Sequence, residues 1–164
     1  MTKAVHENYV RCFWLTAMAD TTLAEVTEAE VAAGTELPGL TADGLNISPT
    51  NNKASVALLD SEKIPQFVGT RMNDLTLKFV RETDALDDVG WELFDHGETG
   101  FLVVSRLRSS KNPSPNLADG DRVEVYKLSV MDPQPLATAQ DTFQQYEVPV
   151  AAENWETKAL VVAS

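Results

Sequence analysis

The chain has few of the residues and motifs that catalysis or metal binding usually requires. Its 164 residues include one cysteine and two histidines, which excludes an internal disulfide and leaves no spacing suited to zinc. It contains no GxSxG nucleophile elbow, no GxxxxGKS/T phosphate loop and no GxGxxG dinucleotide loop. We therefore expect neither an enzyme nor a protein that binds a cofactor or a metal.

Long apolar runs and positive charge are also scarce. No run approaches the ~20 apolar residues that a membrane-spanning helix needs, and the N-terminus lacks a signal-peptide pattern. Against 13 Lys and Arg residues stand 25 Asp and Glu, a net charge of −12 that argues against binding nucleic acid through its phosphates. With 43% hydrophobic residues the chain can still bury a core. We expect one soluble domain over residues 1–164, synthesised in the cytoplasm.

The most regular stretch, residues 73–108, predicts a strand, a short acidic helix and a second strand. Apolar residues alternate along residues 75–80, as in a strand with one buried face. They then recur at helical spacing, which predicts a helix over residues 85–96, with Asp84 as its cap and Gly97 as its stop. The helical stripe consists of Leu86, Val89, Leu93 and Phe94. Residues 101–104 are all apolar, so the second strand is expected to begin buried on both faces.

Local patterns elsewhere predict further strands and one more helix. Strands are predicted at residues 10–18, 45–48, 53–59, 122–130, 145–151 and 155–163. In TEAEVAAG, Thr27 and Glu30 have capping-box spacing, which predicts a short helix that ends at Gly34. The pair Asn51-Asn52 predicts a turn that joins the two short strands around it in a hairpin. Residues 44–72 are thus expected to form a hairpin or loop, either packed on the sheet or projecting from it.

Two stretches of opposite charge are interpreted either as solvated faces or as contacts between copies of the chain. The basic stretch contains Arg106, Arg108 and Lys111. The acidic stretch, residues 82–98, has seven acids and no Lys or Arg. Four of these acids lie on the predicted helix: Asp87, Asp88, Glu92 and Asp95. Paired carboxylates can also perform acid–base catalysis, but nothing else in the sequence indicates a hydrolase.

Several strings follow one another in a distinctive order between Arg11 and Ser164. They are TEAEVAAGTELPGLTADGLNIS, NNKASVALLD, FVGTR, LTLKFVRET, DDVGWELF, GFLVVSR, DGDRVEVY and WETKALVVAS. In this order they resemble the major tail tube proteins of long, non-contractile-tailed bacteriophages. The resemblance implies a mostly β subunit, an antiparallel sandwich or barrel with one flanking helix. It also implies hexameric rings that stack into a tube through which DNA leaves the capsid.

The resemblance also implies functional roles for the features described above. The partners it implies are copies of the chain, a tape measure protein and tail-end proteins, in the tail of the virion. Residues 44–72 are the best candidate for the stacking element, with possible contacts at Asn51, Asn52, Val56, Leu58, Ile64 and Phe67. An acidic wall suits DNA that passes without binding, and the polar strand face with Thr76 and Lys78 is expected to line it. The alternatives are a monomeric β-sandwich module that binds carbohydrate or a cell-surface partner, and a tail terminator or adaptor.

Overall fold

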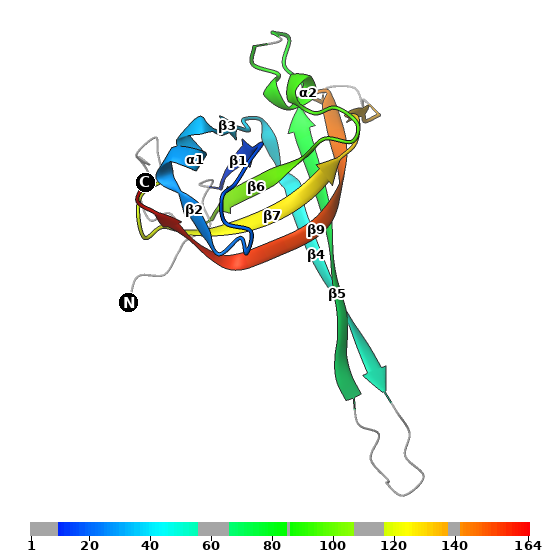
Figure 1. The fold of residues 1–164 in the computed structure, drawn as a ribbon. Coiled ribbons are helices and arrows are strands. Elements are labelled where there is room, and N and C mark those ends of the chain that lie inside the picture. Colours follow the sequence, from blue (N-terminus) through cyan, green and yellow to red (C-terminus); the bar gives the residue numbers. More distant parts are fainter. Residues whose placement is uncertain (1–9, 56–65, 85, 107–116, 138–141) are drawn as a thin grey trace, which may run out of the picture.

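A computed structural model describes residues 10–55, 66–84, 86–106, 117–137 and 142–164. In these ranges the chain is mostly β, as predicted: an antiparallel sheet curls into a half-barrel, accompanied by two short helices (Figure 1). In chain order the elements are β1 Arg11–Leu15, β2 Glu25–Thr27, α1 Glu28–Ala33, β3 Thr35–Glu36, β4 Leu40–Ser55, β5 Gln66–Val80, α2 Val89–Leu93, β6 Thr99–Ser105, β7 Arg122–Val130, β8 Gln134–Pro135 and β9 Gln145–Val162.

The longest strand, β9, joins the two halves of the sheet. The strand order is β3-β1-β6-β7-β9-β5-β4, and β2 and β8 pair with β9 beside this path. The start of β9 pairs with β5, and from Val150 onward it pairs with β7. Its register against β7 shifts twice, and such irregularities bend a strand. The sequence predicted two strands here, at 145–151 and 155–163; this was wrong, because residues 151–154 stay paired with β7 and the strand is continuous.

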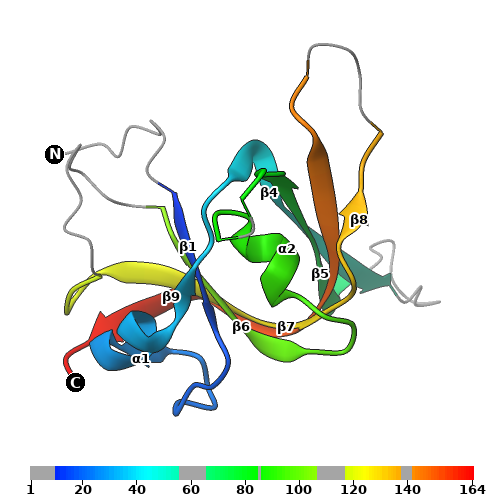
Figure 2. The same ribbon diagram turned by 90° about the horizontal axis from the view of Figure 1, so that it is seen from above.

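The two faces of the sheet carry separate hydrophobic clusters. Leu102 and Val104 of β6 contribute to one cluster, and Val103 contributes to the other, because neighbouring side chains on a strand point to opposite faces. All three are fully buried, as predicted, whereas Phe101, which was included in the same prediction, is only partly buried. Viewed from above, α2 lies inside the curve of the sheet and α1 lies outside it (Figure 2).

Helix α1 follows the sequence prediction. The Thr27 hydroxyl accepts a hydrogen bond from the Glu30 backbone N–H, and the Glu30 carboxylate accepts one from the Thr27 backbone N–H. These bonds satisfy two donors that a helix N-terminus would otherwise leave open. The helix ends at Gly34, where an added Cβ would contact Leu15 and the Trp14 carbonyl.

Helix α2 is shorter than the predicted 85–96. Residue 85 lies outside the described residues, and Asp84 forms a turn in place of a cap: its backbone C=O accepts hydrogen bonds from the N–H groups of Asp87 and Asp88. Leu86, assigned to the apolar stripe, is therefore 86% exposed. The helix begins after Asp88, and extended backbone at Phe94 ends it. Gly97 has the expected positive φ of 86°, but in the turn that leads into β6.

The predicted hairpin around Asn51-Asn52 was also wrong. Strand β4 runs without a turn from Leu40 to Ser55, and Asn51 pairs with Arg71 of β5. The two strands form one long arm that extends away from the body of the molecule (Figure 1). Asn51 is paired with β5 and Asn52 lies at a register shift within the same strand, so their turn propensity does not prevail.

Candidate assembly surfaces

The arm contains the residues that the sequence singled out for contacts between rings. Asn51 and Asn52 lie on β4, and Phe67 lies on β5 opposite Ala54. Val56, Leu58 and Ile64 lie outside the described residues. Among the described strands, β4 pairs with β5 alone, so one side of its backbone has no strand partner in this part of the chain. An edge of 16 residues is long enough to pair with another chain.

A buried ion pair fixes the acidic segment to the sheet. Nε of Arg81 lies 2.6 Å from Oδ2 of Asp88, whose side chain is 2% exposed. The Arg81 guanidinium also stacks 3.7 Å from the ring centroid of Trp91, a cation–π contact. Tyr146 packs edge-on against the same tryptophan. Burial, and then the charge of Asp88, raises the pKa of Tyr146 above its ordinary value.

This arrangement separates Asp88 from the other acids of its segment. Asp87, Glu92 and Asp95 are exposed, whereas Asp88 is committed to Arg81 inside the same chain. A buried, paired carboxylate is not available to a neighbouring subunit. We therefore remove Asp88 from the candidates for contacts between copies.

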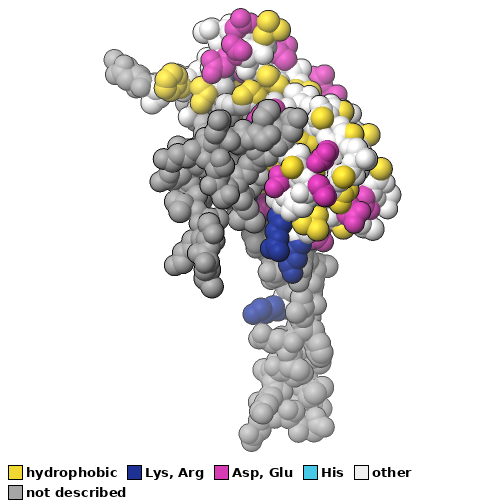
Figure 3. Space-filling model, turned by 90° about the vertical axis from the view of Figure 1, so that its left-hand side faces the viewer, with side chains coloured by type: hydrophobic (Ala, Val, Ile, Leu, Met, Phe, Trp, Pro, Cys, Tyr) yellow, Lys and Arg dark blue, Asp and Glu magenta, His cyan; other side chains and the backbone are white. Residues whose placement is uncertain are grey.

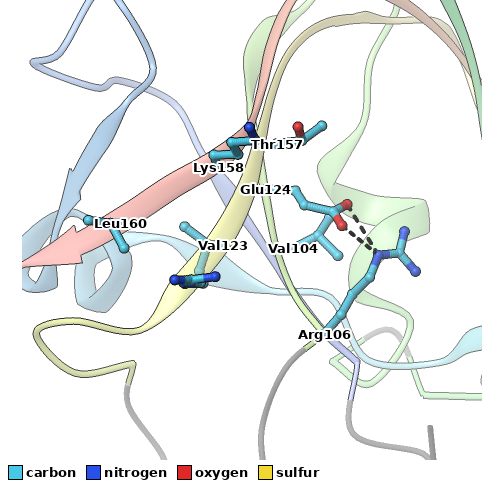
Figure 4. Close-up of a pocket in the computed structure, with 8 residues that line it drawn as sticks. Val104, Arg106, Val123, Glu124, Thr157, Lys158 and Leu160 are labelled. Carbon is cyan, nitrogen blue, oxygen red and sulfur yellow. Dashed lines mark hydrogen bonds and ion pairs between the residues drawn. The ribbon is translucent and has the colours of Figure 1, made fainter. Parts of the chain in front are cut away.

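The surface around Arg106 contains more cations than the sequence analysis indicated. Nε of Arg106 lies 3.1 Å from both carboxylate oxygens of Glu124 on β7, while Arg108 and Lys111 lie outside the described residues. Two cations that sequence reasoning missed, Arg122 and Lys158, line the same hollow of about 440 Å³ (Figure 4). The pairing of Arg122 with Leu160 brings them together across 36 positions, and no local pattern encodes that register.

Acidic and basic side chains occupy different regions of one face of the molecule (Figure 3). On the face in Figure 3, the acidic side chains gather at the end that carries α2 in Figure 1 and along the body, and the visible Lys and Arg lie toward the arm. On the predicted lumen face, Nζ of Lys78 lies 4.0 Å from Oδ2 of Asp43, and Lys78 is the register partner of Glu147. Two acids therefore flank the one cation that this face was expected to carry.

The described residues contain little that suggests catalysis or an aromatic binding platform. In this part of the chain there is no group of three His, Cys, Asp or Glu residues that could hold a metal ion. Burial raises the pKa of the Cys12 thiol to about 12, which suits a packing residue and not a nucleophile. Trp14 is buried, and Trp91 and Trp155 pack partly buried against the same core cluster.

None of the helices in the described ranges has both the length and the apolar character that crossing a bilayer takes.

Comparisons with known proteins identify relatives at the level of family and fold. A family model described as "Phage tail tube protein" matches residues 1–164. Among solved structures, a chain in the six-fold symmetrised cryo-EM structure of the anti-feeding prophage baseplate aligns with a TM-score of 0.58. That alignment covers 95% of this chain and 96% of the other, at 7% sequence identity, and so shows a shared fold. No curated protein matches the chain.

Proposed function

The chain belongs to the phage tail tube protein family, and from that premise we propose that six copies form a ring and that the rings stack into a tube that conducts DNA. It is a structural protein of the virion tail. Synthesis in the host cytoplasm, before incorporation into the tail, is part of the same proposal.

The observation that carries this proposal is the open sheet. Strand β4 lies at one edge of the half-barrel, and its 16 residues present a long row of backbone donors and acceptors. Closure of a sheet on copies of itself removes such edges. Strand β4 in one subunit is therefore proposed to pair with a strand of the next subunit in the ring.

The arm formed by β4 and β5 is the proposed stacking element. It extends away from the body, beyond the residues that pack on the core (Figure 1). Contacts with the next ring are proposed for Asn51, Asn52, Val56, Leu58, Ile64 and Phe67. Contacts within the ring are proposed between the basic residues Arg106, Arg108 and Lys111 and the acids Asp87, Glu92 and Asp95.

The charge of the chain supports a conduit that DNA crosses without specific binding. The net charge is −12, and Lys78 on the proposed lumen face is flanked by Asp43 and Glu147. Phosphates that approach such a wall are repelled at distances within about 8 Å at physiological salt. A tape measure protein and tail-end proteins are the other proposed partners, and no membrane or cofactor takes part.

Negative-stain electron microscopy of the purified protein tests the proposal. We expect rings or tubes with a central channel. A protein that stays monomeric at high concentration would refute self-assembly and return the monomeric binding module as the better hypothesis.

A shortened arm tests stacking separately from ring formation. Asn51 and Arg71 are register partners, so replacing residues 52–70 with a two-residue Asn-Gly turn keeps the hairpin in register. We expect the variant to keep the wild-type circular dichroism spectrum and to form rings without tubes. Tubes of normal length from this variant would contradict the role of the arm.

The baseplate origin of the structural neighbour favours a second candidate, a ring protein at the end of the tail. Such an adaptor or terminator would form rings that do not extend. The images distinguish it from a tube subunit, because only the tube subunit polymerises when the full arm is present.

A further inference from the structure

The hollow at the ends of β6, β7 and β9 has the composition of a protein-binding site. Its lining includes Arg106, Lys158 and a single acid, Glu124 (Figure 4), together with Arg122. Arg106 is paired with Glu124, whereas Arg122 and Lys158 are exposed and have no acidic side chain within ion-pair distance in the described chain. The wall also includes Leu160, an exposed large apolar residue. In a chain of net charge −12, this concentration of cations beside an apolar side chain needs an explanation.

The acidic segment, residues 82–98, has the complementary composition. Asp87, Glu92 and Asp95 are exposed carboxylates. The side chain of Leu86 beside them is 86% exposed, although leucine favours burial. The Arg81–Asp88 ion pair anchors this segment to the sheet, so its exposed acids are held in place and not on a loose loop.

The two surfaces lie at opposite ends of β9. The backbone N–H of Arg81 donates to the carbonyl of Gln144 at 2.8 Å, which puts the acidic segment beside the start of the strand. Lys158 and Leu160 lie near its end. At roughly 3.3 Å per residue, the strand from Gln145 to Lys158 is on the order of 40 Å along its curved path, against a screening length of about 8 Å. Within the described part of one subunit, no ion pair joins the two surfaces.

A second copy of the chain can supply what one subunit lacks. Because the surfaces are different, their contact is head-to-tail, the geometry that produces a ring when the rotation closes. We propose that the hollow of one subunit receives the acidic segment of its neighbour, with Arg122 and Lys158 paired to Asp87 and Glu92 and with Leu160 packed against Leu86. This contact rests on the proposed self-assembly and adds Arg122, Lys158 and both leucines to the interface.

DNA is the competing ligand for a cluster of cations. The acid inside the hollow, Glu124, and the negative charge of the whole chain both oppose a phosphate there. An acidic protein segment with an apolar side chain also matches Leu160, which a phosphate does not. The observations therefore favour protein over nucleic acid.

Charge reversal on each surface tests the contact. The first variant is Arg122→Glu with Lys158→Glu, and the second is Asp87→Lys with Glu92→Lys. All four side chains are exposed, so both variants are expected to keep the wild-type thermal melting curve. Each variant alone is expected to raise the concentration needed for ring formation at least about tenfold, because like charges then face each other. Sedimentation velocity and negative-stain images measure the assembled fraction.

Mixing the two variants provides the decisive measurement. Each intact surface then meets an intact partner and each reversed surface meets a reversed one, so an equimolar mixture is expected to recover assembly. Lys127→Glu is the matched control, since Lys127 is paired with Glu153 and does not line the hollow; it should assemble like the wild type. Assembly of either double variant alone at the wild-type concentration would overturn the inference and leave the proposed function intact.

Two further outcomes keep the proposals distinguishable. Failure of the wild-type chain to form rings under any condition tested would overturn the proposed function and this contact together. Normal ring formation by Arg122→Glu with Lys158→Glu, together with reduced retention of a short DNA duplex, would overturn the contact and assign the hollow to nucleic acid.

Discussion

Arg81 and the buried Asp88 form an ion pair, 2.6 Å between Nε and Oδ2, at the junction of the sheet and α2. The pair anchors a segment that otherwise consists mostly of exposed acids. Trp91 covers the guanidinium, which strengthens the electrostatic contact by excluding water. The segment that we propose as an assembly surface is therefore attached to the sheet although its helix has only five residues.

Removing Arg81 should destabilise the protein more than removing Asp88. Arg81→Met leaves the Asp88 carboxylate buried without its ion-pair partner, at a cost of about 3 kcal/mol in the free energy of unfolding. Asp88→Asn leaves Arg81, whose side chain is 27% exposed and can reach water, so the loss should be smaller. The double variant should lose less than the sum of the two. Urea unfolding measures all three, and additive losses would indicate that the pair contributes no coupling.

Gly100 of β6 lies where any side chain would strike the core. An added Cβ would collide with the Trp14 indole and the Leu15 carbonyl. We expect Gly100→Ala to cost about 1–3 kcal/mol through overpacking and to change tryptophan fluorescence, because Trp14 packs edge-on against Phe94. Thr99→Ala, at an exposed position of the same strand, is the control and should be nearly neutral. A fully stable Gly100→Ala protein would mean that the backbone relaxes there without cost.

The thiol of Cys12 should be unreactive in the folded protein. Burial raises the pKa of its thiol from 9.0 to about 12, which lowers the thiolate fraction at pH 8 about a thousandfold. Ellman's reagent is expected to leave the native protein unmodified and to detect one thiol per chain after denaturation. Rapid modification under native conditions would show that β1 opens readily at this position.

Elements with strong local signals could be predicted from the sequence. Strand β7 has the predicted bounds, Arg122–Val130, because its apolar residues mark it clearly between turn residues. Helix α1 was predicted from its capping box, which is a local pair of side chains. The α1 capping box lies within a few residues, and the apolar pattern of β7 lies within one short window although its partners β6 and β9 are remote.

Features that depend on distant pairing could not be predicted. Asn51 has a strong preference for turns, yet it lies in β4 because Arg71, twenty positions later, pairs with it. The cations Arg122 and Lys158 share a hollow only because β7 pairs with the end of β9. Asp88 differs from its acidic neighbours through the fold around it, not through its sequence context. Register between remote strands is set by the whole sheet, and no short window contains it.

The Glu30 carboxylate should make stability depend on pH through α1. Burial acts to raise its pKa, but hydrogen bonds from the backbone N–H groups of Thr27 and Ala19 and from the Thr27 hydroxyl outweigh burial and hold the pKa below the usual 4.5. A carboxyl group with a depressed pKa in the folded state stabilises the protein above its unfolded pKa. That contribution is lost as the pH falls through the folded pKa.

Glu30→Gln should therefore lower the free energy of unfolding by about 1–2 kcal/mol at pH 7, because a charged acceptor of several hydrogen bonds is lost. The difference from the wild type should stay constant down to about pH 5 and shrink below pH 4.5, where the unfolded chain begins to bind the proton. Glu25→Gln, at an exposed position in β2, should follow the wild-type profile throughout. Urea unfolding at a series of pH values tests this, and a deficit that does not change with pH would show that Glu30 acts by shape and not by charge.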